Sequence, residues 1–158
     1  MIHYKWGKVG KSGGNTMFIG EYRYSIDEKG RLFLPSEMRE DLGMEVIVNR
    51  GIEKCLYIYP LSEWEKIVSK LSTLSFTKKT NREFNRMFLS GAYKREIDTK
   101  GRINLDKNLM EYANLSRECI IIGVGERLEI WDREEWNRYY QERQSVLEEI
   151  SEGIEFDI

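Results

Sequence analysis

The sequence offers little material for metal or nucleophilic chemistry, because its 158 residues include one histidine and two cysteines. Catalytic triads and most metal sites need imidazole groups, and His3 stands alone in a segment rich in glycine and lysine. Cys55 and Cys119 lie 64 positions apart without a CxxC motif, so they support neither a disulfide framework nor a zinc site. We expect two buried thiols in a reducing cytoplasm, with no metal and no cofactor.

Long apolar runs are also absent. No segment approaches the roughly 18 to 20 apolar residues of a membrane-spanning helix, and residues 1–16 lack the apolar core of a secretory signal. We therefore expect neither export nor a membrane partner. With 41% hydrophobic and 33% charged residues, the chain suffices for one ordinary domain or for two half-sized units that share a core.

Charge is unevenly distributed along the chain. The net charge of −2 and the isoelectric point near 5.7 argue, taken alone, against nucleic-acid binding. However, residues 134–158 hold eight acidic and two basic residues, whereas residues 77–102 hold eight basic and three acidic ones. A basic surface is therefore possible on an acidic protein.

The chain contains a tandem duplication. Residues 20–34 align with residues 91–105 at an offset of 71, with eight identical pairs in fifteen positions. The match resumes at an offset of 72 through Leu56/Leu128, Ile58/Ile130, Glu63/Glu135 and Trp64/Trp136. A unit of about 45 residues is too small to bury a sound core alone. We therefore expect the copies to interlock into one pseudo-twofold β-barrel.

Each copy has the pattern of a ββαββ unit, which predicts an α+β, mainly β fold. Expected strands and helix in the first copy are 22–26, 31–34, helix 36–42, 46–48 and 55–59. Those in the second copy are 93–97, 102–105, helix 107–113, 120–122 and 128–131. Gly43 and Asn114 follow the two helices and are residue types that tolerate the left-handed conformation ending a helix.

Further helices are predicted after each copy. Ser62 and Glu65 have the spacing of a capping box at the start of the first of these helices. A second helix starts at Thr80, and one of its faces presents Phe84, Met87 and Phe88; we expect the two aromatic side chains in the core. A last single helix is expected near 133–150.

These patterns divide the chain into five parts: a disordered leader at 1–16, a first repeat at 17–64, a helical connector at 65–90, a second repeat at 91–136 and a C-terminal helix with an acidic tail at 137–158. Three interpretations of the leader are open. It is a basic arm that contacts phosphates, a segment ahead of a translation start at Met17, or a sequence foreign to the natural protein, and we favour the second.

The sequence repeats one turn motif, D-x-K-G-R. Its aspartate and glycine have a structural explanation, since aspartate accepts backbone N–H bonds in a turn and glycine adopts positive φ. These turn-forming residues are Asp27, Gly30, Asp98 and Gly101. A hairpin needs neither the lysine nor the arginine, whose side chains suit phosphate or guanine. Alternatively, Arg31 forms an ion pair with Asp27 across its own turn, and the two hypotheses are compatible.

Five segments together resemble a known family: MFIGEY from Met17, IDEKGRL from Ile26, CLYIYPLSEW from Cys55, SGA from Ser90 and GVGERLEIW from Gly123. They are similar to the MraZ family of bacterial transcriptional regulators, which are built from two AbrB-like swapped-hairpin repeats. The resemblance extends from Met17 to about Arg143. It implies a ring-shaped homo-oligomer on the nucleoid that binds double-stranded DNA at repeated boxes upstream of the division and cell-wall gene cluster.

The resemblance also implies site residues. The family places its DNA contacts at the D-x-K-G-R corner, which corresponds here to Lys29, Arg31, Lys100 and Arg102. Arg23 and Lys94, on the strands that lead into the corners, are further candidates by position. The second copy departs from the first at Asn104, where the first has Phe33, and at Asp106, where the first has Pro35.

Two other functions are open at this stage. An enzyme would use Asp27 and Asp98 as a pseudo-symmetric pair of carboxyl groups, which needs one raised pKa. The neighbouring Lys and Arg residues instead favour ionisation of both. An antitoxin-like module would bind a protein partner through its acidic helical tail, which would then be indispensable.

Overall fold

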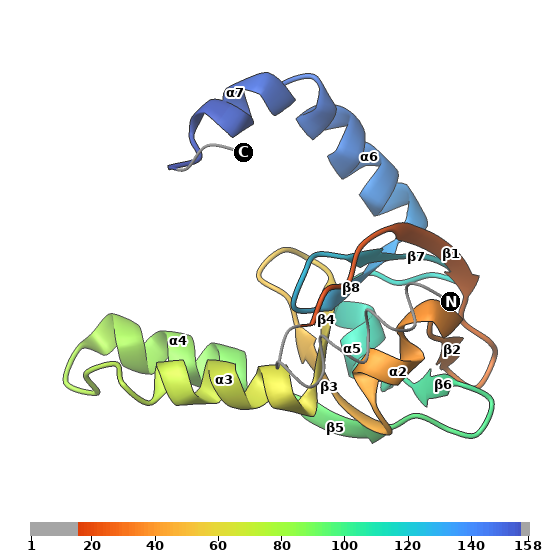
Figure 1. The fold of residues 1–158 in the computed structure, drawn as a ribbon, viewed down its shortest axis with the longest axis horizontal. Helices are drawn as coiled ribbons and strands as arrows, with labels where there is room; N and C mark the ends of the chain where they lie inside the picture. Colours follow the sequence, from red (N-terminus) through yellow and green to blue (C-terminus); the bar gives the residue numbers. More distant parts are fainter. Residues whose placement is uncertain (1–15, 156–158) are drawn as a thin grey trace.

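Strands of the two repeats are interleaved in one antiparallel sheet. The computed structural model describes residues 16–155, and its six-stranded sheet has the order β1-β7-β8-β4-β3-β5. The first strand of each repeat pairs with the third strand of the other, β1 with β7 and β5 with β3. A second sheet, β2–β6, also takes one strand from each repeat, and it contacts both edge strands, β1 and β5. The predicted interlocking of the copies is therefore confirmed (Figure 1).

The elements match the predicted ββαββ units closely. Those of the first repeat are β1 (Glu21–Ser25), β2 (Arg31–Phe33), the 3-10 helix η1 (Ser36–Met38), α2 (Arg39–Leu42), β3 (Glu45–Arg50) and β4 (Leu56–Pro60). Those of the second are β5 (Tyr93–Glu96), β6 (Arg102–Asn104), α5 (Lys107–Tyr112), β7 (Glu118–Gly123) and β8 (Leu128–Asp132). The two residues after the helices, Gly43 and Asn114, have φ of +82° and +52°, as their residue types indicate.

The large sheet buries side chains on both faces. Val46 and Val48 belong to an inner core with β2, β6, α2 and α5, whereas Ile47 between them points to an outer core. The helices α3 (Leu61–Leu71) and α6 (Arg133–Gln144) cover that outer face through Trp64 and Trp136. Burial on both faces explains why β3, β4 and β7 contain continuous apolar runs rich in β-branched and aromatic residues.

Both cysteines are buried free thiols, as predicted. Burial raises the pKa of the Cys119 thiol to about 12, and it raises the pKa of Cys55 further. The thiolate is the reactive form of cysteine, and at neutral pH both groups are protonated thiols, so they are unreactive. Their role is that of small apolar side chains in the core.

The predicted capping box at Ser62 is wrong. Helix α3 begins at Leu61 with Pro60 as its N-cap, and no side chain caps it. Pro60 fixes φ at −60° and starts the helix two residues earlier than the sequence pattern indicates, which puts Ser62 inside the first turn. The equivalent position in the second repeat, Asp132, does cap α6, since its carboxylate accepts a hydrogen bond from the backbone N–H of Glu135.

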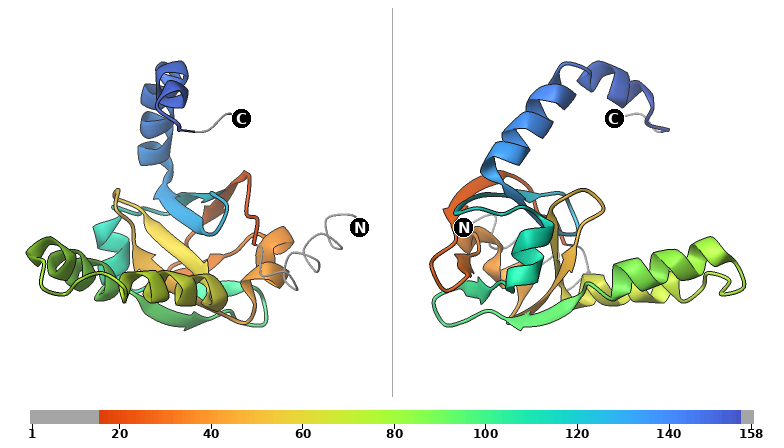
Figure 2. Two further views of the ribbon diagram at one scale, coloured as in Figure 1. Left: turned by 60° about the vertical axis from the view of Figure 1, so that its left-hand side comes forward. Right: turned by 180° about the vertical axis from the view of Figure 1, so that it is seen from behind.

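The core assignment of the aromatic side chains on the second connector helix is also wrong for one of the two, Phe84. Helix α4 (Lys79–Leu89) packs against α3 as a hairpin that projects from the body (Figures 1 and 2). Phe88, near its base, contacts Trp64 and the outer core. Phe84 and Met87 are 41% and 68% exposed, because the projecting hairpin lies beyond the sheet that would cover them.

The C-terminal segment forms two helices where one was predicted. Helix α6 ends at Gln144, Val146 leaves the helical conformation at φ −120° and ψ 17°, and α7 (Leu147–Glu152) follows. Trp136 and Tyr139 hold the first turns of α6 on the outer core. Helix α7 has no buried residue, so nothing in the body imposes a straight continuation. The predicted leader lies almost entirely outside the described residues.

The corner glycines predict a graded loss of stability. Gly30, Gly101 and Gly125 have φ of +80°, +87° and +93°. An alanine at each carries left-handed strain of about 1–2 kcal/mol. Its Cβ would also lie 2.9 Å from the backbone carbonyl oxygen of Leu105 at Gly30, which cannot move aside, and would meet the flexible side chain of Arg39 at Gly101, but it meets nothing within 4 Å at Gly125. We expect the melting temperature to fall most for Gly30→Ala and least for Gly125→Ala. A Gly30→Ala protein that melts no lower than Gly125→Ala contradicts the close packing of Gly30 against the Leu105 carbonyl.

Candidate nucleic-acid interface

Each D-x-K-G-R motif folds into a tight corner that its aspartate holds together. The Asp27 carboxylate accepts hydrogen bonds from the backbone N–H groups of Lys29 and Arg31, both at 2.9 Å. The Gly30 N–H donates to the Asp27 carbonyl at 3.0 Å. The second corner repeats this geometry, with distances of 2.9 and 2.8 Å from the Asp98 carboxylate to Lys100 N and Arg102 N.

The two corner arginines are held by ion pairs within their own turns. Arg31 Nε lies 2.7 Å from Asp27 Oδ2, and Arg102 Nε lies 2.8 Å from Asp98 Oδ2. The alternative considered from the sequence is thus present at both corners. It does not occupy the arginines fully, since their terminal nitrogens make no hydrogen bond within residues 16–155 and the side chains are 32% and 18% exposed. Each guanidinium is oriented by its aspartate and has donors available for a ligand.

The corner aspartates are held in the ionised form. Hydrogen bonds from the Arg31 backbone N–H, and then from its side chain and from Lys29 N, lower the pKa of Asp27, and partial desolvation opposes them. The equivalent groups at Arg102 and Lys100 lower the pKa of Asp98. A carboxyl pair for acid–base catalysis needs one raised pKa. The geometry therefore favours a charged, structural role for both aspartates.

The corners are tied to each other across the two repeats. The Leu34 N–H donates to the Gly101 carbonyl at 3.0 Å, and the Leu105 N–H donates to the Gly30 carbonyl at 2.8 Å. The strands that leave the corners, β2 and β6, pair directly. Both turns consequently lie at one end of the body (Figure 1). Lys29, Arg31, Lys100 and Arg102 thus belong to one surface.

Arg23 and Lys94 are not brought to that surface. Arg23 pairs across the sheet with Ile120, and Lys94 pairs with Ile47. Those two isoleucines belong to the outer core, so both basic side chains lie on the outer face of the sheet. The strands lead into the corners, but side chains four residues before the corner aspartates sit along the strand and away from the turn.

The structure places one further basic residue, Arg39, beside the second corner, and the sequence patterns do not predict this position. Arg39 donates from Nε and Nη2 to the Leu34 carbonyl at 3.1 and 3.0 Å, and its guanidinium packs against Gly101. The duplication gives no signal for it, because the equivalent residue of the second repeat is Met110, which lies near Gly30. The two corners therefore differ in charge.

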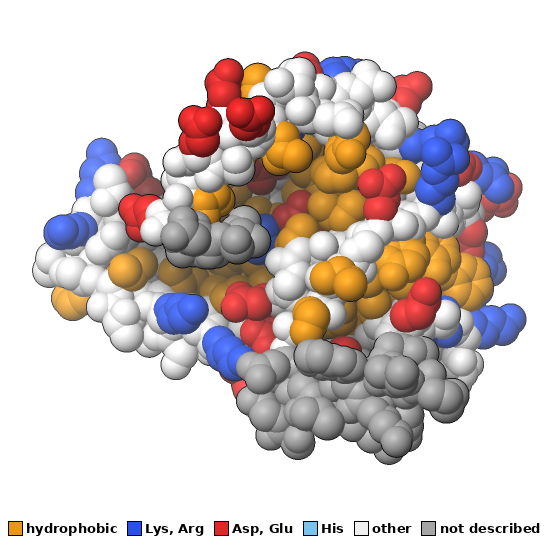
Figure 3. Space-filling view, turned by 45° about the horizontal axis from the view of Figure 1, so that its top comes forward, with side chains coloured by type: hydrophobic (Ala, Val, Ile, Leu, Met, Phe, Trp, Pro, Cys, Tyr) orange, Lys and Arg blue, Asp and Glu red, His pale blue; other side chains and the backbone are white. Residues whose placement is uncertain are grey.

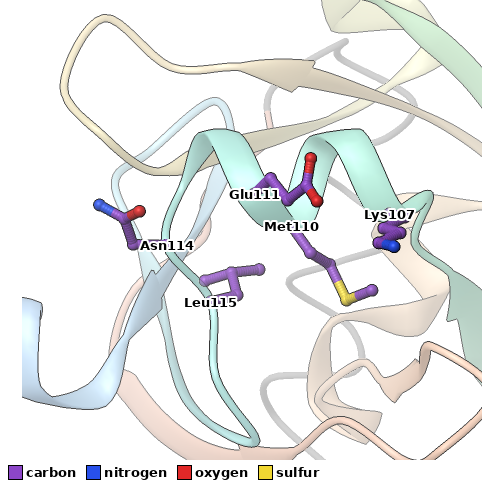
Figure 4. Close-up of a pocket in the computed structure, with 5 residues that line it drawn as sticks. All are labelled: Lys107, Met110, Glu111, Asn114 and Leu115. Atoms are coloured by element: carbon purple, nitrogen blue, oxygen red, sulfur yellow. The ribbon is translucent and has the colours of Figure 1, made fainter.

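An open groove follows α5 and is lined by Lys107, Met110, Glu111, Asn114 and Leu115 (Figure 4). These side chains come from one helix and its C-terminal turn, and they combine a lysine, a glutamate and apolar groups. Across residues 16–155, no cluster of histidine, cysteine or carboxylate side chains is arranged to hold a metal ion. The same residues include no helix that is both long and apolar enough to cross a membrane.

The duplication and the corner motif agree with a family comparison. The family model for the MraZ protein, whose description likens it to antitoxins, matches residues 17–87 and again residues 88–154. The chain belongs to the MraZ family. The family model therefore matches the chain twice in tandem, and each matched segment contains one D-x-K-G-R corner.

The corner geometry predicts an acid titration for this MraZ-family protein. A folded pKa below the ordinary aspartate value of 3.8 stabilises the folded state above that value, and this stability is lost as the pH falls through the folded pKa. NMR titration of the carboxyl carbons should give midpoints below 3.8 for Asp27 and Asp98. Arg31→Ala should raise the midpoint of Asp27 and leave that of Asp98 unchanged. Midpoints at or above 3.8 in the unsubstituted protein contradict the corner geometry.

Proposed function

We propose that this protein is a sequence-specific transcriptional regulator that binds double-stranded DNA through its two corners. The observation that carries the proposal is the pair of rigid turns at one end of the body, tied together by the β2–β6 ribbon. Each turn displays an oriented arginine and an exposed lysine. A protein that only needed hairpin turns would require neither side chain.

The two kinds of side chain suit different parts of DNA. An arginine guanidinium matches the O6 and N7 acceptors of guanine in the major groove, whereas a lysine is a mobile point charge that suits phosphate. The aspartate ion pairs fix the arginines before binding, which reduces the conformational entropy lost on complex formation. Arginines would thus supply sequence preference, and Lys29 and Lys100 would supply salt-dependent affinity.

Family membership supports the genomic target. We infer that the protein binds repeated boxes upstream of the division and cell-wall gene cluster, as the sequence resemblance implies, and does so on the nucleoid. Because each chain has only two corners, contacts to one box are few. Binding to several spaced boxes by an oligomer would raise the overall affinity through effective concentration.

The surface of the protein supports self-association into a ring. Hydrophobic side chains gather in the hollow beneath the C-terminal helices (Figure 3). Further apolar residues are exposed on the two helical arms of the molecule, the α3–α4 hairpin and the α6–α7 segment. The arms have opposite charge, because α4 carries Lys79, Arg82 and Arg86 against Glu83, whereas α7 carries Glu148, Glu149 and Glu152. We infer that α4 of one copy packs on α7 of the next. Such a head-to-tail contact closes into a ring when its rotation allows.

A second candidate is an antitoxin-like module that holds a protein partner. The family description and the exposed acidic surface of α7 favour it. Deletion of residues 145–158 separates the candidates. DNA binding by a single copy at the corners does not need this segment, whereas capture of a partner through the acidic tail does. An unsubstituted protein that binds no DNA box but captures a protein partner, with that capture lost on deletion at an intact fold, favours the second candidate.

The first test removes the corner guanidinium groups. We expect Arg31→Ala and Arg102→Ala to weaken binding to the DNA upstream of the protein's own gene by about 1–3 kcal/mol each, which is the cost of removing a bidentate base contact. Arg23→Ala removes the same charge from the outer face and is the matched control. Gel-shift titrations with melting curves provide the measurement. Operator affinity that is unchanged in the Arg31/Arg102 double variant contradicts the proposal.

Lysine removal should act differently. Lys29→Ala and Lys100→Ala are expected to weaken binding to operator and unrelated DNA alike. Each should also reduce the slope of log affinity against log salt by about one, because one phosphate charge is no longer neutralised. The salt series should run on both DNA sequences. A weakening confined to operator DNA would reverse the assigned roles of lysine and arginine.

The oligomer contact can be tested at its apolar residues. Met87 on α4 and Leu147 on α7 are 68% and 60% exposed. We expect Met87→Asp and Leu147→Asp each to convert the oligomer to smaller species in light-scattering measurements, because either change places a charge in the contact. Ile52→Asp makes the same change at a 71% exposed position on the β3–β4 turn and should leave the mass unchanged. An unsubstituted protein that is monomeric, or both arm variants at full oligomer mass, contradicts the contact.

A further inference from the structure

The β2–β6 ribbon presents four side chains on its exposed face. Leu32 and Ile103 are buried in the inner core, so their neighbours on both strands point outward. Arg31 lies directly opposite Asn104, and Phe33 lies directly opposite Arg102. On the outward face, each arginine therefore lies opposite a residue that the D-x-K-G-R motif does not include, Asn104 or Phe33.

The two pairs on this face are chemically different. The Arg102 guanidinium lies 5.8 Å from the centre of the Phe33 ring, which is 40% exposed. Beside Arg31, the exposed Asn104 amide makes a long 3.4 Å hydrogen bond to the Lys29 carbonyl. Phe33 and Asn104 occupy equivalent positions of the two repeats, and each lies next to the corner of the other repeat. The pseudo-twofold symmetry of the fold is thus broken at these two positions.

We propose that Asn104 and Phe33 are specificity-determining residues and that the two corners recognise different bases; this inference rests on the DNA binding proposed above. Asn104 recognises adenine at N6 and N7 next to the base that Arg31 contacts. Phe33 packs against the C5 methyl group of a thymine next to the base that Arg102 contacts. A two-stranded ribbon fits the major groove, which admits both sets of contacts together.

The two corners also differ in the charges that surround them. The first corner contains Glu28, where the second contains Thr99. Arg39 packs beside the second corner, and the uncharged Met110 takes the equivalent place near the first. The second corner is therefore the more positive of the two and the stronger phosphate anchor. Unequal anchors and unequal base contacts together give the protein one preferred orientation on an asymmetric box.

The test exchanges the two residues within the full-length protein. We would select duplexes from a randomised library with the unsubstituted protein, with Phe33→Asn, with Asn104→Phe and with the double exchange. Phe33→Asn should replace a thymine preference by adenine at one position and lower affinity for the original box about 5- to 150-fold. The double exchange should favour the same two bases in exchanged positions. Affinity for unrelated DNA at low salt should stay unchanged in all variants.

The outcomes separate this inference from the proposed function. Selection of the original box by all variants, at unchanged affinity, would overturn the roles of Phe33 and Asn104 and leave DNA binding intact. An unsubstituted protein that selects no box would overturn both. Where an exchange lowers the melting temperature, Asn104→Ala tests the first corner alone, since the side chain is exposed. It should lose the adenine preference and retain the thymine preference.

Discussion

The structure depends on an exchange of strands between two copies of a small unit. Each first strand pairs with the third strand of the other repeat, and β2 pairs with β6. The hydrogen bonds from Leu34 to Gly101 and from Leu105 to Gly30 close the exchange at the corners. Because the inner core contains side chains from both repeats, neither copy has a complete core without the other.

This exchange also gives the candidate site its form. A hairpin turn on an isolated loop would move independently of its neighbour, but each corner here is hydrogen-bonded to the strand that leaves the other. Within each corner, the aspartate carboxylate orders both the backbone and the arginine. The same bonds that hold the fold together therefore fix the positions of the charges. Such preorganisation is what a surface needs to recognise a regular ligand.

The duplication made much of this predictable from sequence. Repeated D-x-K-G-R turns and β-branched runs identified both ββαββ units, since local chemistry specifies turns and strands strongly. Apart from the start of α3, which Pro60 sets locally, the errors occurred where tertiary context decides. An apolar face on α4 is exposed because the α3–α4 hairpin projects from the body, and the pattern beyond Gln144 does not continue one helix because α7 has no buried residue that would fix its direction. Arg39 was missed because its side chain reaches the corner of the other repeat, a contact that only the strand exchange creates.

The corners and the ribbon between them are the surface that we propose for DNA binding. Hydrogen-exchange mass spectrometry of the full-length protein, with and without a duplex from upstream of its own gene, tests this assignment most directly. We predict slower exchange on DNA binding in residues 27–34 and 98–105 and unchanged exchange in α3 and α4. Slower exchange confined to the helical arms, with unchanged exchange at both corners, would contradict the assignment.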